Sequence, residues 1–223
     1  MHGMIIAFPN LKHTFSYNYD MSKEHHVLVV PGLGGENSGF RKIVNSWEKY
    51  GFTPHVHDMD WTDGKNEFKP KLERLIATID ELHSNDGIIS LVGTSAGGSA
   101  VLNAFYDRKD QIHRVVNVCG RLRAGQNVYP SLDFASRKSP AFKESVTLFE
   151  RREPLLTTEE RNKILTIRAL FDEVVPTSTS TLQGAKNIRV FSIEHMLSIT
   201  AAMTLYVKPM IEFLQESNRK GLE

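Results

Sequence analysis

The stretch at positions 87–98 reads GIISLVGTSAGG, and it decides the fold. Its first seven residues, 87–93, form the clearest strand pattern in the chain, a short apolar run with a glycine at each end. From Ser95 onward, Val101, Leu102 and Phe105 follow at helical spacing. A buried strand that passes through a glycine-rich turn straight into a helix is typical of a parallel sheet covered by helices.

Strands and helices continue to alternate on both sides of this stretch. Short apolar or β-branched runs predict further strands, at 25–31, 52–58, 113–120, 163–171 and 187–193. Apolar residues at helical spacing predict helices over 40–47 and 68–82, and a final helical region from about 198 that Pro209 kinks or restarts. Two N-terminal runs, MIIAFP and KHTFSY, are compatible with an opening hairpin. We therefore predict one α/β domain over 1–223, with a mostly parallel sheet and helices on both of its faces.

Residues 121–162 interrupt the alternation. They contain three prolines and no clear strand, and their apolar spacing predicts one helix, through Phe142, Val146 and Phe149. Long connections of this kind are often lids or binding loops. We expect 121–162 to be a small cap inserted between two strands, with Phe134 and these three residues lining a pocket.

The composition indicates a soluble globular protein. Of the 223 residues 40% are hydrophobic and 24% are charged, and the formal net charge is +1. So small a net charge provides no strong field to attract nucleic acid or an anionic membrane, so we expect neither as a partner. Cys119 is the single cysteine, which excludes an internal disulfide and fits a reducing compartment. The sequence shows no signal peptide and no apolar window of membrane-spanning length, so we expect a cytoplasmic protein; the oligomeric state is not predicted.

Gly93-Thr94-Ser95-Ala96-Gly97 matches the pattern G-x-S-x-G. The pattern alone is weak, because a chain of this length matches it by chance roughly one time in fifteen. Its position between a strand and a helix is the context that the motif requires. A sharp turn there presents the Ser95 hydroxyl at the start of a helix, where amide dipoles favour negative charge. The pattern favours a nucleophilic serine over a serine that only caps the helix.

With this motif in place, most of the chain outside 121–162 resembles the α/β-hydrolase family. In that family an acid and then a histidine follow the serine in the sequence. The segment Asp172-Glu173-Val174-Val175-Pro176 follows a late strand and is similar to the family's D-x-x-V-P segment. The resemblance implies Asp172 as the acid, with Glu173 as its local rival, and His195 after the last strand as the base. The remaining eight histidines occupy less suitable positions.

The resemblance also implies two backbone donors for a developing oxyanion. One is the N–H of Ala96, directly after the serine. The other is the N–H of Leu33, in the turn Pro31-Gly32-Leu33-Gly34-Gly35, which is similar to the family's His-Gly-x-x-Gly loop. This chain departs from that loop by having Pro31 where histidine is usual, so a different group must support the turn.

The function that the resemblance implies is hydrolysis of a small carboxylic ester or thioester through an acyl-enzyme, with a small-molecule acyl substrate and no cofactor or metal. Two alternatives stay open at this point. The same triad could transfer the acyl group to an acceptor other than water, or the fold could serve as a non-catalytic binding scaffold, because fold alone does not establish function.

Three other patterns do not support a site. The glycine-rich turn at 32–39 fits neither G-x-G-x-x-G nor a P-loop, because the required glycine and the Lys-Ser/Thr pair are missing. His55 and His57 face one side of a strand, but their spacing to later carboxylates matches no metal motif. Over 121–163, nine basic and six acidic residues are too close in number to indicate an anionic substrate.

Overall fold

The computed structural model describes residues 23–84 and 87–216. The hairpin expected at the N-terminus lies outside these residues. The described part contains a six-stranded sheet in the order β2-β1-β3-β4-β5-β6, and every neighbouring pair of strands is parallel. The strands are β1 (His25–Val30), β2 (Phe52–Val56), β3 (Ile88–Thr94), β4 (Ile112–Val118), β5 (Ile164–Ala169) and β6 (Lys186–Val190). The predicted parallel sheet is confirmed.

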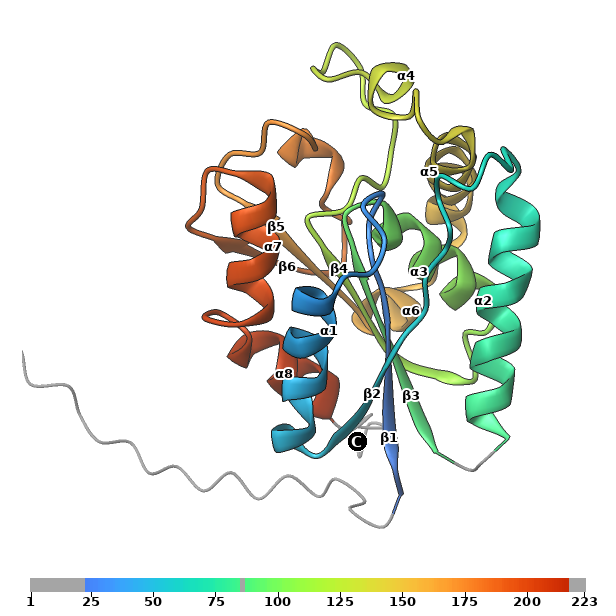
Figure 1. The fold of residues 1–223 in the computed structure, drawn as a ribbon, viewed down its shortest axis with the longest axis vertical. Coiled ribbons are helices and arrows are strands. Elements are labelled where there is room, and N and C mark those ends of the chain that lie inside the picture. The colour runs from blue at the N-terminus through green and yellow to red at the C-terminus, as the bar shows by residue number, and fades with distance from the viewer. Residues whose placement is uncertain (1–22, 85–86, 217–223) are drawn as a thin grey trace, which may run out of the picture.

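Helices cover both faces of the sheet (Figure 1). On one face lie α1 (Ser38–Asn45), α7 (His195–Met203) and α8 (Lys208–Gln215); on the other lie α2 (Phe68–His83), α3 (Ala96–Asp107) and α5 (Pro140–Arg152). The shorter helices are η1 (Ser46–Tyr50), α4 (Leu132–Ala135), η2 (Glu153–Leu155), α6 (Thr158–Asn162) and η3 (Thr177–Thr179). This is the three-layer arrangement that a sheet buried on both faces requires.

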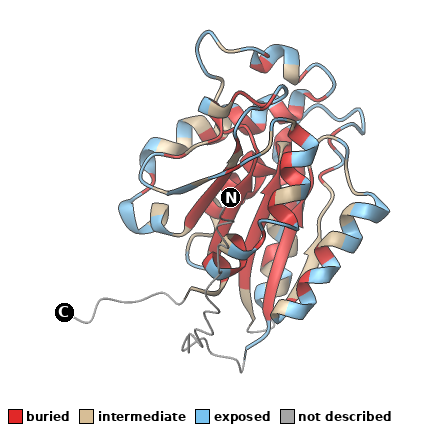
Figure 2. Cartoon of the chain, turned by 90° about the vertical axis from the view of Figure 1, so that its left-hand side faces the viewer, coloured by how far each residue is buried: buried red, intermediate tan, exposed pale blue. Residues whose placement is uncertain are grey.

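The core consists of two apolar layers, one on each side of the sheet. Along β1, Leu28 and Val30 contribute to the layer under α2, α3 and α5, while Val27 and Val29 contribute to the layer under α1, α7 and α8. Successive side chains on a strand point to opposite faces, so an uninterrupted apolar strand supplies both layers at once. Figure 2 shows the central strands buried between more exposed helices. The burial explains why the sequence pattern at β1 and β3 was uninterrupted rather than alternating.

The last two helices differ slightly from the sequence expectation. Helix α7 begins at His195 rather than near Ser198, because the Glu194 side chain accepts hydrogen bonds from the N–H groups of Met196 and Leu197 and so caps the helix at an earlier residue. Pro209 lies in the first turn of α8, where a missing N–H costs nothing, so it marks a new helix and not a kink.

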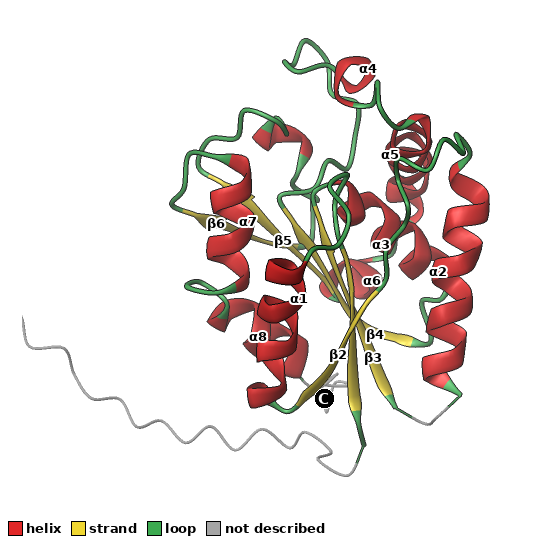
Figure 3. Ribbon diagram, viewed as in Figure 1, coloured by secondary structure: helices red, strands yellow, loops and turns green. Residues whose placement is uncertain are grey.

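The segment 121–162 contains several helices instead of the predicted single one, and it divides in two. The helix through Phe142 is α5, which packs against α2 and α3 in the layer beside the sheet. Val146 and Phe149 are fully buried in that layer, so they do not line a pocket as expected. The part that projects beyond the sheet is α4 with its flanking loops, which Figure 3 shows at the top of the molecule.

Among the described residues, no single helix combines the length and apolar character of a membrane span; α7 and α8 meet both criteria only when taken together, with a 54° bend at the break between them.

Candidate active site

Ser95 lies in a strained turn between β3 and α3. Its backbone has φ 51° and ψ −121°, in the positive-φ range that residues with a side chain rarely adopt. The turn is possible only because its neighbours are glycines. A Cβ on Gly93 would lie 2.3 Å from the Gly97 carbonyl oxygen, and a Cβ on Gly97 would lie 2.1 Å from the Val30 carbonyl oxygen. Both glycines of the sequence motif are therefore required by close backbone approach, and the turn holds Ser95 beyond the end of the strand.

Ser95, His195 and Asp172 form a continuous hydrogen-bonded chain. The His195 Nε2 atom lies 2.9 Å from Ser95 Oγ, and His195 Nδ1 lies 2.7 Å from Asp172 Oδ2. The side chains of His195 and Asp172 are buried, while Ser95 is half-buried and reaches the pocket. The structure thus brings together three residues that are up to 100 positions apart in the sequence. In this arrangement the imidazole can accept the serine proton while the carboxylate holds its other nitrogen.

Asp172 and Glu173 point in different directions. Asp172 Oδ1 accepts hydrogen bonds from the N–H groups of Val174 at 2.9 Å and Val175 at 2.7 Å, which leaves Oδ2 for the imidazole. The Glu173 carboxylate instead accepts the backbone N–H of His195, at 3.1 and 3.3 Å. Glu173 therefore contacts the first residue of α7, and Asp172 is the carboxylate placed against the imidazole.

The two predicted backbone donors lie beside the serine. Ala96 is the first residue of α3, where an N–H has no acceptor within the helix. Leu33 lines the same pocket as Ser95, and its N–H makes no hydrogen bond to another residue within the described part of the chain. Gly32 is in close contact with the serine, because a Cβ there would lie 2.7 Å from Ser95 Cβ. These contacts bring the turn after β1 within reach of an acyl group on Ser95.

Asp58 and Trp61 support this turn where the family's histidine is absent. Asp58 Oδ2 accepts the Glu36 N–H at 3.0 Å, and Trp61 Nε1 donates to the Pro31 carbonyl at 3.2 Å. Gly35 has φ 64°, which brings its backbone against Asp58. Sequence reasoning did not identify these two supports. Asp58 comes shortly after β2, at the same end of the sheet as Ser95, and this position in the sequence could have indicated its role.

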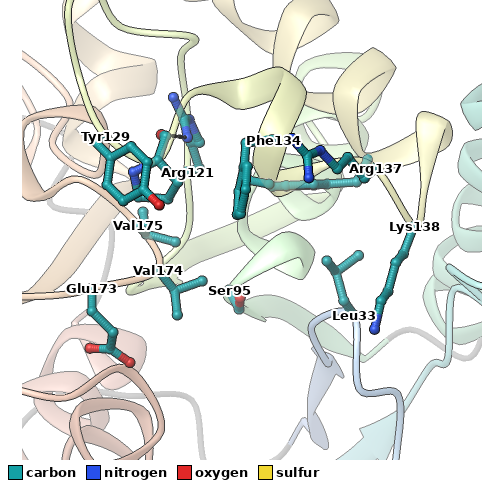
Figure 4. A pocket seen from close by; sticks show the side chains of 13 residues that line it. Leu33, Ser95, Arg121, Tyr129, Phe134, Arg137, Lys138, Glu173, Val174 and Val175 are labelled. Carbon is teal, nitrogen blue, oxygen red and sulfur yellow. Dashed lines mark hydrogen bonds between the residues drawn. The ribbon is translucent and has the colours of Figure 1, made fainter.

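A cavity of about 420 Å³ opens above Ser95 (Figure 4). Its lining comes from the turns after β1 and β3, from α4 and its flanking loops, from the first turn of α5, and from the loop after β5: Leu33, Ser95, Arg121, Tyr129, Pro130, Phe134, Ala135, Arg137, Lys138, Phe142, Glu173, Val174 and Val175. Phe134 and Phe142 line the cavity as predicted. Most of the lining residues therefore belong to α4 and its flanking loops.

Arg121 holds the loop that forms one wall of this cavity. Its guanidinium donates to the carbonyls of Arg123, Ala124 and Pro130, and its side chain is fully buried. Burial lowers the pKa of Arg121, and the charge of Glu150 opposes that effect. No pattern in the sequence indicated these hydrogen bonds of Arg121, since their acceptors are backbone carbonyls and carry no residue-type signal.

The loops that carry the site also expose an apolar rim. Within the described residues twelve large hydrophobic side chains are exposed, and nine of them, here called the apolar rim, either line the cavity or flank Asp172 or His195 in the sequence: Tyr129, Phe134, Leu170, Phe171, Val174, Phe191, Ile193, Met196 and Leu197. Most flank Asp172 or His195 in the sequence. Seven of these nine side chains follow β5 or β6 and so lie outside the segment 121–162.

The strand histidines and the single cysteine lie outside the hydrogen-bonded chain of Ser95, His195 and Asp172. His55 Nε2 lies 3.1 Å from His26 Nδ1, and His57 Nδ1 lies 3.1 Å from Thr78 Oγ1, so the two imidazoles contact different partners. Burial, with a smaller effect of the Asp172 charge, raises the pKa of the Cys119 thiol to about 12. A thiol with so high a pKa stays protonated at neutral pH and is a poor nucleophile.

Comparison with known proteins identifies the fold. No family model and no curated protein matches the sequence. Solved structures do match. One comes from work on LipS and LipT, two metagenome-derived lipolytic enzymes, with 15% identity, 86% of this chain and 94% of that chain covered, and a TM-score of 0.66.

Another is the monoacylglycerol lipase of Paleococcus ferrophilus, with 17% identity, 85% and 93% coverage and a TM-score of 0.60. A third is MGS-MChE2, an alpha/beta hydrolase enzyme from the metagenome of lagoon sediments of Mar Chica, Morocco, with 14% identity, 86% and 90% coverage and a TM-score of 0.58. The chain has the α/β-hydrolase fold. In this α/β-hydrolase fold, Ser95 occupies the turn after β3, while Asp172 follows β5 and His195 follows β6, so all three lie beyond the carboxyl ends of parallel strands.

Proposed function

We propose that this protein is a serine hydrolase that cleaves a small carboxylic ester or thioester. The observation that carries the proposal is the hydrogen-bonded chain from Ser95 Oγ through His195 to Asp172, with distances of 2.9 and 2.7 Å. The geometry supports a nucleophile, a base and an orienting carboxylate in their working order. Structural neighbours that are named as lipolytic enzymes or lipases are in keeping with this function.

The reaction would proceed in two steps. His195 Nε2 takes the proton of Ser95 as its oxygen attacks the acyl carbon, and the backbone N–H groups of Leu33 and Ala96 stabilise the oxyanion. His195 then gives the proton to the leaving alcohol or thiol. Water, activated by the same imidazole, hydrolyses the acyl-enzyme and restores Ser95. Asp172 holds the imidazole with Nδ1 protonated and stabilises its cationic form. These steps require no cofactor.

The size of the cavity favours a small substrate. Ligand sites commonly occupy about 300 to 1,000 Å³, and a cavity of about 420 Å³ is near the lower end of that range. Phe134, Phe142 and Val175 provide apolar contact for a few methylene groups. A long acyl chain would need space outside this cavity.

Labelling with a fluorophosphonate probe, followed by identification of the modified residue, tests the proposal. Such probes react with a serine that a neighbouring base activates. We expect the probe on Ser95, no labelling of Ser95→Ala, and unchanged labelling of the control Ser178→Ala, which changes an exposed serine outside the cavity lining. In the Ser95→Ala variant, kcat should fall by a factor on the order of 10⁶.

The alternatives give different results in the same assay. A non-catalytic scaffold would leave the folded wild-type protein unlabelled, which would refute the proposal. An acyltransferase would be labelled, but adding an alcohol acceptor would then increase the release of the leaving group and yield a transferred ester.

A further inference from the structure

The cavity beside Ser95 is more positively charged than the chain as a whole. Its lining includes Arg121, Arg137 and Lys138 but only one carboxylate, Glu173. The whole chain, in contrast, has a net charge of +1. Arg121 is a fully buried part of the cavity wall, and its three hydrogen bonds go to neutral carbonyls, although the charge of Glu150 also acts on it. The tertiary structure thus gathers positive charge at a place that the composition of 121–163 does not reveal.

The carboxylates near Arg137 and Lys138 already have partners. Asp133, on α4, pairs with Lys143 at 2.5 Å, and Glu173 accepts the backbone N–H at the start of α7. Across residues 23–84 and 87–216, neither Arg137 nor Lys138 forms an ion pair within 4.0 Å. Both charges are therefore available to a ligand in the cavity.

Local contacts hold these two cations at the cavity wall. The Arg137 guanidinium lies 4.2 Å from the centroid of the Phe134 ring, a distance at which a cation and an aromatic face attract each other. Ser139, directly after Lys138, is buried and caps α5, which fixes the end of the segment. The Lys138 side chain extends from this segment toward Leu33 (Figure 4). An anion in the cavity could therefore meet both cations with little rearrangement.

The triad determines which part of a substrate faces these cations. The leaving group must lie on the side of His195, because Nε2 gives it a proton. Glu173 contacts the backbone of His195 and so lies on that side. In Figure 4, Glu173 and Lys138 are on opposite sides of Ser95. An acyl chain that leaves the reacting carbon in the other direction would extend toward Lys138.

We propose that the enzyme selects acyl groups that end in a carboxylate, and that Lys138 and Arg137 bind this carboxylate. The inference rests on the proposed hydrolase function and specifies its substrate class: monoesters or monothioesters of dicarboxylic acids. Lysine and arginine supply charge-assisted hydrogen bonds to the tail, and the buried Arg121 adds to the positive potential behind it. The apolar residues of the cavity contact the methylene groups between the two ends.

A matched pair of esters tests the inference. 4-Nitrophenyl hydrogen adipate carries a terminal carboxylate, and 4-nitrophenyl 6-methylheptanoate replaces it with an uncharged isopropyl group of similar shape. We expect kcat/KM for the wild-type enzyme to be about tenfold higher with the adipate, a ratio that corresponds to about 1.4 kcal/mol. The difference should arise mainly in KM and should decrease as salt is added, because salt screens partly exposed charges.

Variants assign the preference to these residues. In the double variant Lys138→Ala/Arg137→Ala the adipate-to-heptanoate ratio should fall to near one, and in Lys138→Glu it should fall below one. The matched control is Arg151→Ala, which removes an exposed cation of the segment 121–162 that does not line the cavity, and it should keep the wild-type ratio.

Two results overturn the inference alone: a wild-type enzyme that prefers the uncharged ester, or a preference for adipate that persists in the double variant. A protein that cleaves neither ester and leaves the fluorophosphonate probe unreacted overturns the hydrolase proposal, and the inference falls with it.

Discussion

Replacing Asp172 by asparagine should inactivate the enzyme through the orientation of a single amide. In the structure Asp172 Oδ1 accepts two backbone N–H groups, from Val174 and Val175, at 2.9 and 2.7 Å. An asparagine must keep its carbonyl oxygen at that position, since its NH₂ group cannot accept a hydrogen bond. The NH₂ group therefore faces His195 Nδ1, the atom that Asp172 Oδ2 contacts in the native protein at 2.7 Å.

An amide donor at Nδ1 fixes the wrong imidazole tautomer. Nδ1 must then accept, so the proton resides on Nε2, which can no longer take the proton of Ser95. The reversed amide would leave the N–H groups of Val174 and Val175 without this acceptor, at a cost of about 1–3 kcal/mol for the buried N–H of Val175. The loss in kcat should therefore be close to the full effect of a wrong tautomer, about 10⁴-fold, which corresponds to about 5.5 kcal/mol of barrier.

The matched control is Glu173→Gln. Its side-chain carbonyl can still accept the His195 backbone N–H, so kcat should change by no more than about threefold. Initial rates on a 4-nitrophenyl ester, with circular dichroism and thermal unfolding to verify folding, measure both variants. An Asp172→Asn enzyme that is folded and within tenfold of wild type would refute the reasoning, as would a larger loss for Glu173→Gln.

Three further predictions follow from close contacts, buried histidines and cavity size. Gly32→Ala should lower kcat at least 100-fold, because its Cβ would lie 2.7 Å from Ser95 Cβ and a displacement of about 1 Å in an active site can cost about that much. The control Gly34→Ala, with nothing within 4 Å of its Cβ, should stay near wild type. Equal activities of the two variants would contradict the prediction. Burial lowers the pKa of His25 to about 3 and of His113 to about 4, below the value of 6.5 in the unfolded chain. The unfolded state therefore binds more protons, and the free energy of unfolding should decrease by up to about 1.4 kcal/mol per pH unit for each histidine as pH falls from about 6.5 toward 4. A urea midpoint that is constant from pH 7 to 5 would argue against this prediction. Across uncharged 4-nitrophenyl esters from acetate to palmitate, kcat/KM should rise over the first few carbons, by roughly fourfold per fitted methylene, and then fall; a maximum at twelve or more carbons, or a jump in rate above the micelle threshold, would instead show that the apolar rim binds lipid aggregates.

The sequence by itself determined the fold and indicated the strand-to-helix turn that holds Ser95, because both depend on local patterns. Strand and helix periods and the two glycines around Ser95 are enforced by neighbouring residues, so they are visible in the chain before it folds. Asp172 and His195 were placed through their order relative to Ser95, and the structure brings the three together at hydrogen-bonding distance. Their catalytic roles stay predictions until they are tested.

Only the tertiary structure decided what surrounds the triad. Val146 and Phe149 fit a pocket lining by sequence, but α5 packs on α2 and α3 and buries them in the core. Conversely, the counts of basic and acidic residues over 121–163 nearly balance, yet pairing such as Asp133 with Lys143 leaves Arg137 and Lys138 at the cavity. Such pairing depends on distances between elements far apart in the sequence, and no local pattern encodes those distances.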